Sequence, residues 1–219
     1  MSLIPWRIKN FASEHFPVAY HVVVNLGVSR NSQEYWDDRL AEAWNHPGGF
    51  WPTKVAAITQ LVQPEESIVD IGCGTGSILR DLRDRGYSRL HGLEQSEYAV
   101  KRLSAEGITM SRGDLLHMPF EDSHFDVAIA SQVLEHVIRR NRFCRELSRI
   151  VKPSGRVFIF VPNDRLGPIS EPTHVAKYNA RSLRTFLDRH WTVESVSPLV
   201  EPHNGADCLF AVCRNVKPG

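Results

Sequence analysis

The sequence lacks the features that mark membrane, secreted and polyanion-binding proteins. No run of apolar residues is long enough to cross a bilayer. Charges at Arg7, Lys9 and Glu14 interrupt any signal-peptide core near the first residue. Lysine and arginine number 26 against 25 aspartates and glutamates, so the basic excess typical of nucleic-acid-binding proteins is missing. We therefore expect a cytoplasmic protein with no stable membrane insertion and no nucleic-acid partner.

Cysteine is also scarce. The chain has four cysteines, Cys73, Cys144, Cys208 and Cys213. No two of them form a C-x-x-C pair, the spacing that would indicate a metal or redox motif. We therefore expect free, buried thiols in a reducing compartment.

The glycine-rich stretch that ends at Gly76 lacks the third glycine of the dinucleotide fingerprint. It follows an apolar, β-branched run typical of a buried strand and precedes a helical pattern. Gly72, Gly74 and Gly76 alternate, and Ser77 stands where G-x-G-x-x-G requires glycine. Glycine allows a sharp turn and close approach to a ligand, and the start of a helix offers N–H groups to an acceptor. The spacing indicates a nucleotide-type site but argues against a nicotinamide-dependent oxidoreductase.

Strand and helix patterns alternate from about residue 53 onwards. The expected strands lie at 67–72, 89–94, 108–111, 125–130, 156–161, 192–199 and 208–215. The expected helices lie at 53–63, 76–85, 97–106, 137–151 and 180–189. Such alternation predicts an α/β fold with a doubly wound, mostly parallel sheet of seven strands. The last two strands have no helix between them, so we expect them to pair antiparallel.

The first 50 residues lie outside this alternation. Two weak helical patterns occupy 5–26, with Pro17 as a break, and 32–45. A chain of 219 residues has room for one domain and a modest extension. We therefore expect an N-terminal helical extension or lid over 1–50 and the main domain over 51–219.

Aromatic residues are concentrated in this extension. Trp36, Leu40 and Trp44 have the spacing of one helix face. One interpretation is an amphipathic layer packed on the domain, and another is a lid whose aromatic side chains line an acceptor pocket. In a third, the Trp6–Phe11 segment touches a membrane surface.

Two motifs resemble those of a known enzyme family. The string from Val69 to Gly76, VDIGCGTG, resembles motif I of the class I S-adenosylmethionine (SAM) methyltransferases. The segment from Ser131 to Val137, SQVLEHV, is similar to the "LEHV" segment of the methyltransferase type 11 group, which includes ubiquinone-pathway O-methyltransferases. The resemblance covers about residues 53–215. It implies the Rossmann-like methyltransferase fold with an antiparallel last strand, SAM as cofactor and S-adenosylhomocysteine as product.

Several polar residues follow successive strands, where ligands of a doubly wound sheet bind. The resemblance implies that Asp70 and the glycine loop hold the methionine end of SAM. Glu94 is expected to accept hydrogen bonds from ribose hydroxyls, as the acidic residue of dinucleotide folds does. The resemblance also implies that Asp114 and the Leu115 N–H bind the adenine. The expected SAM-binding residues are Asp70, Gly72, Cys73, Gly74, Gly76, Glu94, Gln95, Asp114, Leu115, Ser131 and Gln132.

The reaction implied by the resemblance needs little covalent help from the protein. A methyl group on a sulfonium is already electrophilic, so the protein mainly aligns the acceptor and excludes water. A general base is needed only if the acceptor must lose a proton. The candidate catalytic residues are His136, in the "LEHV" segment, and His174 and Tyr178, after the fifth strand. Each histidine also has a plain structural interpretation, as a packing residue or an exposed loop residue.

A metal-assisted mechanism has a partial signature. Some relatives, including small-RNA 2′-O-methyltransferases, bind a divalent ion through a Glu-x-x-Glu-His segment and, in the RNA enzymes, a later histidine. Gln132 replaces the first glutamate here, whereas Glu135, His136 and His174 match the rest. Loss of one carboxylate weakens a site for a hard cation. We therefore expect no metal.

The sequence thus predicts a SAM-dependent methyltransferase that methylates an oxygen or nitrogen atom of a small molecule. The aromatic extension favours an apolar or ring-containing acceptor. The alternatives are a metal-assisted enzyme like the RNA 2′-O-methyltransferases and a non-catalytic SAM-binding partner subunit. Both a monomer and a homodimer fit the sequence.

Overall fold

The computed structural model describes residues 11–12, 15–24, 32–45, 52–163, 173–201 and 207–216. Most of the predicted membrane-contact segment Trp6–Phe11 lies outside these ranges. Within them, no helix combines the length and apolar character that crossing a membrane requires.

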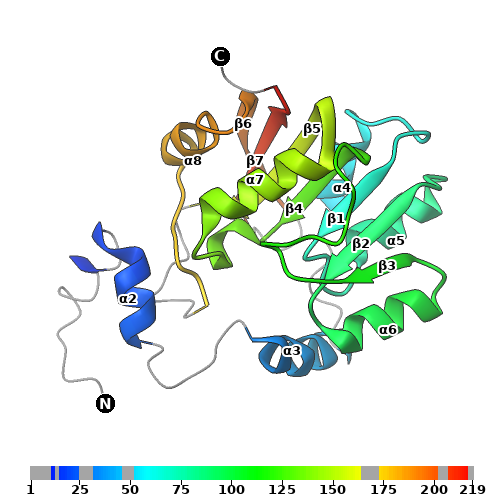
Figure 1. Cartoon of the computed structure of the whole chain (residues 1–219), viewed down its shortest axis with the longest axis horizontal. Helices are drawn as coiled ribbons and strands as arrows, with labels where there is room; N and C mark the ends of the chain where they lie inside the picture. The colour runs from blue at the N-terminus through cyan, green and yellow to red at the C-terminus, as the bar shows by residue number, and fades with distance from the viewer. Residues whose placement is uncertain are drawn as a thin grey trace.

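A seven-stranded sheet forms the centre of the molecule (Figure 1). The strands are β1 (Ile68–Ile71), β2 (Leu90–Glu94), β3 (Thr109–Arg112), β4 (Phe125–Ser131), β5 (Val151–Pro162), β6 (Thr192–Val200) and β7 (Asp207–Arg214). Their order is β3-β2-β1-β4-β5-β7-β6. β1 to β5 pair in parallel, and β7 pairs antiparallel with both β5 and β6. This arrangement confirms the predicted doubly wound sheet with an antiparallel last strand.

Helices cover both faces of the sheet. The described helices are α2 (Pro17–Val24), α3 (Gln33–Asn45), α4 (Pro52–Thr59), α5 (Ser77–Asp84), α6 (Glu97–Ala105), α7 (Arg140–Ile150) and α8 (Ala180–Leu187), with a 3₁₀ turn at Leu134–His136. Of these, α4 to α8 pack against the strands. On one face, Val55 and Ile58 of α4 pack with Ile68 and Ile129. On the other face, α7 and α8 pack with the side chains that point the opposite way, such as Val69 and Ile71. Alternate strand residues therefore separate the core into two layers.

Two helices begin at residues whose side chains cap them. The Ser96 hydroxyl accepts a hydrogen bond from the Ala99 N–H at the start of α6, and Asn179 forms a reciprocal capping box with Ser182 at the start of α8. Residues 11, 12 and 15 are helical, Phe16 is not, and a new helix, α2, begins at Pro17. Pro17 thus breaks the helical pattern as predicted, and it occupies a first helical position, where its missing N–H costs nothing.

The helix predicted at 137–151 is shorter than expected. It begins at Arg140 because Val137 has an extended backbone, with φ −92° and ψ 117°, and Arg139 is the non-helical N-cap residue. β5 begins at Val151, earlier than predicted, because that residue already pairs with Phe125 of β4.

Candidate functional site

Two adjoining cavities lie at the carboxyl ends of the parallel strands. The larger has a volume of about 560 Å³ and the smaller of about 380 Å³. Both are lined by the residues Trp36, Leu40, Gly72, Gly74, Gln132 and His136. This is the edge at which doubly wound sheets bind their ligands.

The predicted SAM-binding residues divide between the two cavities. Glu94, Gln95, Asp114 and Leu115 line the larger cavity. Asp70, Cys73 and Ser131 line the smaller one. Gly72, Gly74 and Gln132 line both. The predicted adenosine-binding and methionine-binding residues are thus adjacent but distinct groups.

Gly76 is the predicted residue that the structure places elsewhere. It lines neither cavity and has a backbone φ of +74°. A Cβ atom at this position would lie 2.4 Å from Cδ2 of Leu103 in α6. Gly76 is therefore needed for the left-handed turn and for the close packing of α6.

Glu94 joins the glycine loop to the end of β2. One carboxylate oxygen accepts a hydrogen bond from the Gly74 N–H at 3.0 Å. The other accepts from the N–H groups of Gln95 and Ser96, at 2.8 and 3.1 Å. Burial raises the pKa of Glu94, and these three N–H groups oppose the rise because they favour the charged form. The carboxylate is thus held in place on the wall of the larger cavity.

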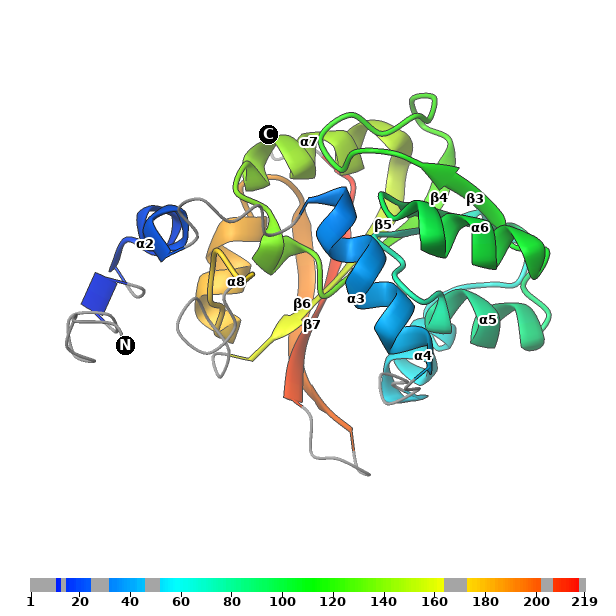
Figure 2. The same ribbon diagram turned by 90° about the horizontal axis from the view of Figure 1, so that it is seen from below.

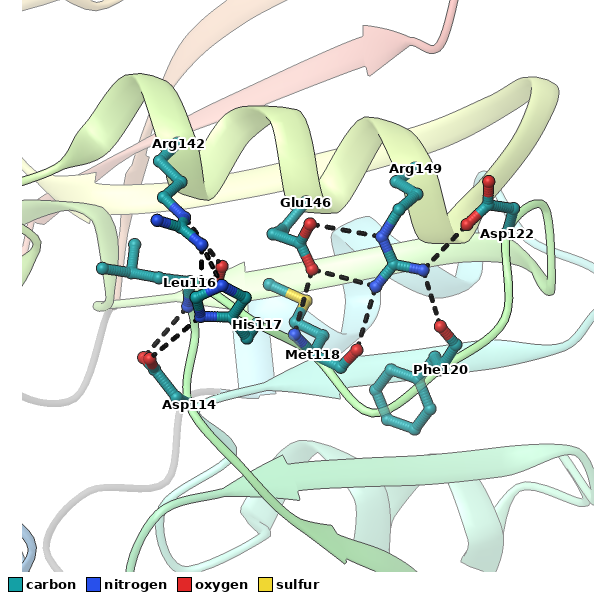
Figure 3. Close-up of polar contacts among 9 residues, drawn as sticks. All are labelled: Asp114, Leu116, His117, Met118, Phe120, Asp122, Arg142, Glu146 and Arg149. Atoms are coloured by element: carbon teal, nitrogen blue, oxygen red, sulfur yellow. Dashed lines mark hydrogen bonds and ion pairs between the residues drawn. The ribbon is translucent and has the colours of Figure 1, made fainter.

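The loop after β3 carries Asp114 and Leu115 to the same cavity. The Asp114 carboxylate accepts a hydrogen bond from the Leu116 N–H at 3.0 Å. Nε of Arg142, in α7, donates to the Leu116 carbonyl at 3.1 Å, and Arg142 also contacts His117 (Figure 3). The predicted adenine-binding residues therefore sit on a loop that α7 holds.

The next turns of α7 hold the rest of this loop (Figure 3). The Glu146 carboxylate accepts a hydrogen bond from the Met118 N–H at 3.0 Å. Arg149 donates to the carbonyls of Met118 and Phe120, at 2.9 and 2.6 Å. It also pairs with Glu146 at 2.9 Å, so the two side chains brace one another. Sequence reasoning did not anticipate this role of α7.

Helix α3 contributes Trp36 and Leu40 to the lining of both cavities, and Figure 2 shows the helix in front of the central strands. The Asp37 carboxylate accepts hydrogen bonds from the Ser96 hydroxyl, at 2.6 Å, and from the Tyr98 N–H, at 3.1 Å. These bonds attach α3 to the start of α6, while Trp36 and Leu40 line the cavities. This placement fits the lid interpretation of the extension.

The two predicted catalytic histidines meet in the smaller cavity. The His136 and His174 ring centroids are 4.7 Å apart, and Trp36 packs edge-on against His136 at 5.4 Å. Nδ1 of His136 lies 3.1 Å from the Thr173 carbonyl. Ligand atoms of Glu135, His136 and His174 all lie within 4.8 Å of one another. The Glu135 side chain is 1% exposed, and its carboxylate oxygens have no hydrogen-bond partner among the described residues.

Tyr178, the third candidate catalytic residue, does not lie with the two histidines. It is buried in the core on the α7 side and lines neither cavity. Its hydroxyl accepts a hydrogen bond from Arg140 at 3.0 Å, and burial raises its pKa to about 12. A phenol with so high a pKa is a poor general base near neutral pH.

Lys54 is a site residue that sequence reasoning missed. It lies in α4, is 3% exposed and lines the smaller cavity. Its Nζ donates a hydrogen bond to the Ser131 hydroxyl at 3.0 Å and lies 5.5 Å from the Phe160 ring. The available signal was a lysine one helical turn before Ile58, on the apolar face of the helix that precedes motif I.

The smaller cavity also contains two carboxyl groups with raised pKa values. Burial and the charge of Glu94 raise the pKa of Asp70 to about 8, although Lys54 opposes the rise. Burial raises the pKa of Glu135 to about 8. Asp70 is 2% exposed, and its Oδ1 has no hydrogen-bond partner among the described residues. These carboxyl groups suit a cationic ligand, which would favour their charged forms.

These raised pKa values predict that the ligand-free protein loses stability as the pH rises. An unfolded Asp or Glu titrates near pH ~4. Between about pH 5 and 8, the folded protein therefore retains protons that the unfolded chain has lost, and its stability falls by up to ~1.4 kcal/mol per pH unit for each group. We expect the melting temperature to fall across this range, and to fall less in Asp70→Asn. Asp84→Asn, at an exposed site on α5, is the matched control. An equal fall in wild type and Asp70→Asn would contradict the prediction.

Comparison with known proteins agrees with this geometry. Residues 69–159 match the methyltransferase type 11 family model, described as a methyltransferase domain. A methyltransferase from a complex with the Haloferax volcanii Trm112 methyltransferase activator has the same fold, with a TM-score of 0.72 and 19% identity over 87% of this chain and 98% of that one.

The curated relatives carry different names. Sterol 24-C-methyltransferase erg6 of Schizosaccharomyces pombe is 28% identical over 43% of this chain and 27% of its own length. The probable tRNA methyltransferase 9B of Bos taurus is 30% identical over 61% of this chain and 28% of its own length. The probable chloroplastic tocopherol O-methyltransferase of Oryza sativa subsp. japonica is 31% identical over 61% of this chain and 39% of its own length. The chain thus matches less than half the length of each of these relatives.

Proposed function

We propose that this chain, which contains a class I methyltransferase domain with SAM as its cofactor, methylates an oxygen or nitrogen atom of a small molecule. The observation that carries this proposal is the pair of adjoining cavities at the carboxyl ends of the strands. The larger cavity has the size and polar groups for the adenosine, with Glu94 toward the ribose and Asp114 and Leu115 toward the adenine. The smaller cavity suits the methionine end, because Asp70 presents a buried carboxylate oxygen that has no hydrogen-bond partner within the described part of the chain.

SAM, when bound, supplies a methyl group on a positively charged sulfur and leaves as S-adenosylhomocysteine. His136 lies where the two cavities join, so its imidazole is placed close to the expected path of this transfer. Donation from Nδ1 to the Thr173 carbonyl selects the tautomer whose Nε2 carries a lone pair. That nitrogen can accept the proton of a hydroxyl acceptor. His174 lines the same space, and its ring packs edge-on against the His136 imidazole and so helps to orient it.

The walls near His136 favour an apolar acceptor. Trp36, Leu40, Val133, Val137 and Ile138 all line the larger cavity. The names of two relatives, a sterol and a tocopherol methyltransferase, denote apolar substrates with rings. We infer an acceptor of the same chemical kind, with a ring that packs against Trp36.

A metal-assisted reaction is the second candidate, because Glu135, His136 and His174 bring their ligand atoms within 4.8 Å of one another. Two features weigh against it. The group has one carboxylate where hard cations prefer several oxygen ligands. The Lys54 ammonium also lies close enough to Glu135 to influence its charge and would repel a cation there.

Cofactor identity is tested by calorimetric titration of SAM, S-adenosylhomocysteine and NAD. We expect the wild-type protein to bind the first two and not NAD. Asp70→Ala should weaken SAM binding at least ~10-fold, because it removes a buried charge-assisted contact of about 1.5–3 kcal/mol. An unchanged dissociation constant in this variant would remove Asp70 from the proposed site, and a preference for NAD would refute the assignment of the cofactor.

The catalytic roles are tested by single-turnover rates with an acceptor found by screening phenolic and other ring-containing compounds. We expect His136→Gln to slow methyl transfer by about 10²-fold or more, because a positioned base contributes that much. The SAM dissociation constant should change less than the rate. Tyr178→Phe tests the third candidate, and we expect a smaller loss because the Tyr178 hydroxyl faces Arg140. Full rates in both His136→Gln and His174→Gln would exclude the general-base proposal.

Metal dependence is tested by dialysis against a chelator. We expect activity to survive, since the Lys54 ammonium opposes a cation beside Glu135. Loss of activity that magnesium or manganese restores would favour the metal-assisted alternative. A Glu135→Gln variant should then lose the response to the ion.

A further inference from the structure

One buried lysine and two buried carboxylic acids line the smaller cavity. Lys54, Asp70 and Glu135 are 3%, 2% and 1% exposed, respectively. They come from α4, from β1 and from the 3₁₀ turn after β4. Burying such groups is expensive unless each is paired, so this cluster is more than a consequence of packing.

We propose that Lys54 binds the carboxylate of the methionine end of SAM, while Asp70 binds the ammonium group of the same amino acid. This inference rests on the proposed function and adds to it a residue outside the motifs. It assigns Lys54 a direct contact with the cofactor rather than a role in the fold alone.

The chemistry of the ligand requires a partner of each sign. The methionine end of SAM carries an ammonium and a carboxylate on neighbouring carbon atoms. Asp70 lines the cavity as a buried acceptor for the first. A carboxylate that leaves water needs a cation or several N–H donors, because an unpaired buried charge costs several kcal/mol. The smaller cavity can offer both, because the glycine loop and two basic side chains line it, and of these only a basic side chain supplies a full opposite charge.

Lys54 and Arg39 are the lysine and arginine side chains among the described residues that line this cavity. Arg39 is exposed on α3, where it donates to the Tyr35 hydroxyl at 3.2 Å. Lys54 is buried and lines the cavity together with Asp70. Burial lowers the pKa of Lys54, and the charges of Glu135 and Asp70 oppose this because they favour the ammonium form. Lys54 is thus the better placed of the two cations.

The sheet explains why Lys54 lies there. Ile68 and Ile129 point toward α4 and α5. Because side chains two positions apart share a face, Asp70 and Ser131 point toward the same helices. The Ser131 hydroxyl then holds Nζ of Lys54 at 3.0 Å, close to the strand ends. An ammonium with three N–H donors can bridge Ser131 and a ligand carboxylate.

The competing explanation is that Lys54 only neutralises Asp70 and Glu135. The two explanations differ in what they predict for a ligand without a carboxylate. SAM and decarboxylated SAM share the adenosine, the sulfonium and the amine. If Lys54 binds the carboxylate, its removal weakens SAM selectively. If Lys54 acts through Asp70, its removal weakens both ligands alike.

The test is calorimetric titration of both ligands into wild type, Lys54→Met and Lys101→Met. We expect wild type to bind SAM at least tenfold more tightly than decarboxylated SAM. Lys54→Met should lose at least tenfold in SAM affinity and less than threefold for the decarboxylated ligand. Lys101→Met, at an exposed site on α6, should match wild type. Melting temperatures establish that each variant is folded.

Equal weakening of both ligands in Lys54→Met would overturn the assignment, as would a wild type that does not distinguish them. If Lys54→Met does not fold, Ser131→Ala replaces it. Loss of the hydroxyl that holds Nζ should reduce the preference for SAM, and an undiminished preference would count against Lys54. A wild type that binds neither SAM nor S-adenosylhomocysteine would instead refute the proposed function itself.

Discussion

The rest of the site depends on the burial of charge at the end of the sheet. Asp70 and Glu135 are almost inaccessible to water, and both have pKa values near 8. Lys54, from α4, lines the same cavity as these two carboxyl groups. A polar group in this position is costly unless it is paired, either within the protein or with a ligand. Among the described residues, Asp70 Oδ1 and both carboxylate oxygens of Glu135 have no hydrogen-bond partner, and the charged ligand that we propose would provide one.

The larger cavity depends on a different constraint, the attachment of loops to rigid elements. Glu94 fixes the glycine loop to the end of β2, and α7 fixes the loop after β3. The walls that face the adenosine are thus formed by backbone that is hydrogen-bonded on more than one side. Such preorganisation reduces the entropy that a ligand loses on binding.

Most of the fold could be predicted from the sequence because its signals are local. Apolar runs, glycine stops and the capping residues Ser96 and Asn179 marked the strands and helices. The predicted cofactor residues also lie together, because parallel strands place their carboxyl ends at one edge. The position of β6 and β7 followed from the absence of a helix between them.

The rest depended on packing that no local pattern reveals. Gly76 belongs to the glycine motif, but it packs against Leu103 and lines neither cavity. Tyr178 was a candidate base, but its hydroxyl faces Arg140. Lys54 is near Asp70 because α4 crosses the same face of the sheet, a tertiary relation between two short segments. The length of α7 was overestimated because Val137 is extended and Arg139 is the N-cap residue, so the helix starts at Arg140.

The placement of α3 has an evolutionary consequence. It lines both cavities from outside the sheet, through Trp36 and Leu40, whereas the residues expected to hold the cofactor follow the strands. Substitutions on α3 can therefore reshape the space near His136 without altering strand register or the glycine loop. If the proposed function is right, changes in this one helix would alter recognition of the acceptor more than they alter the strand ends that are expected to hold the cofactor.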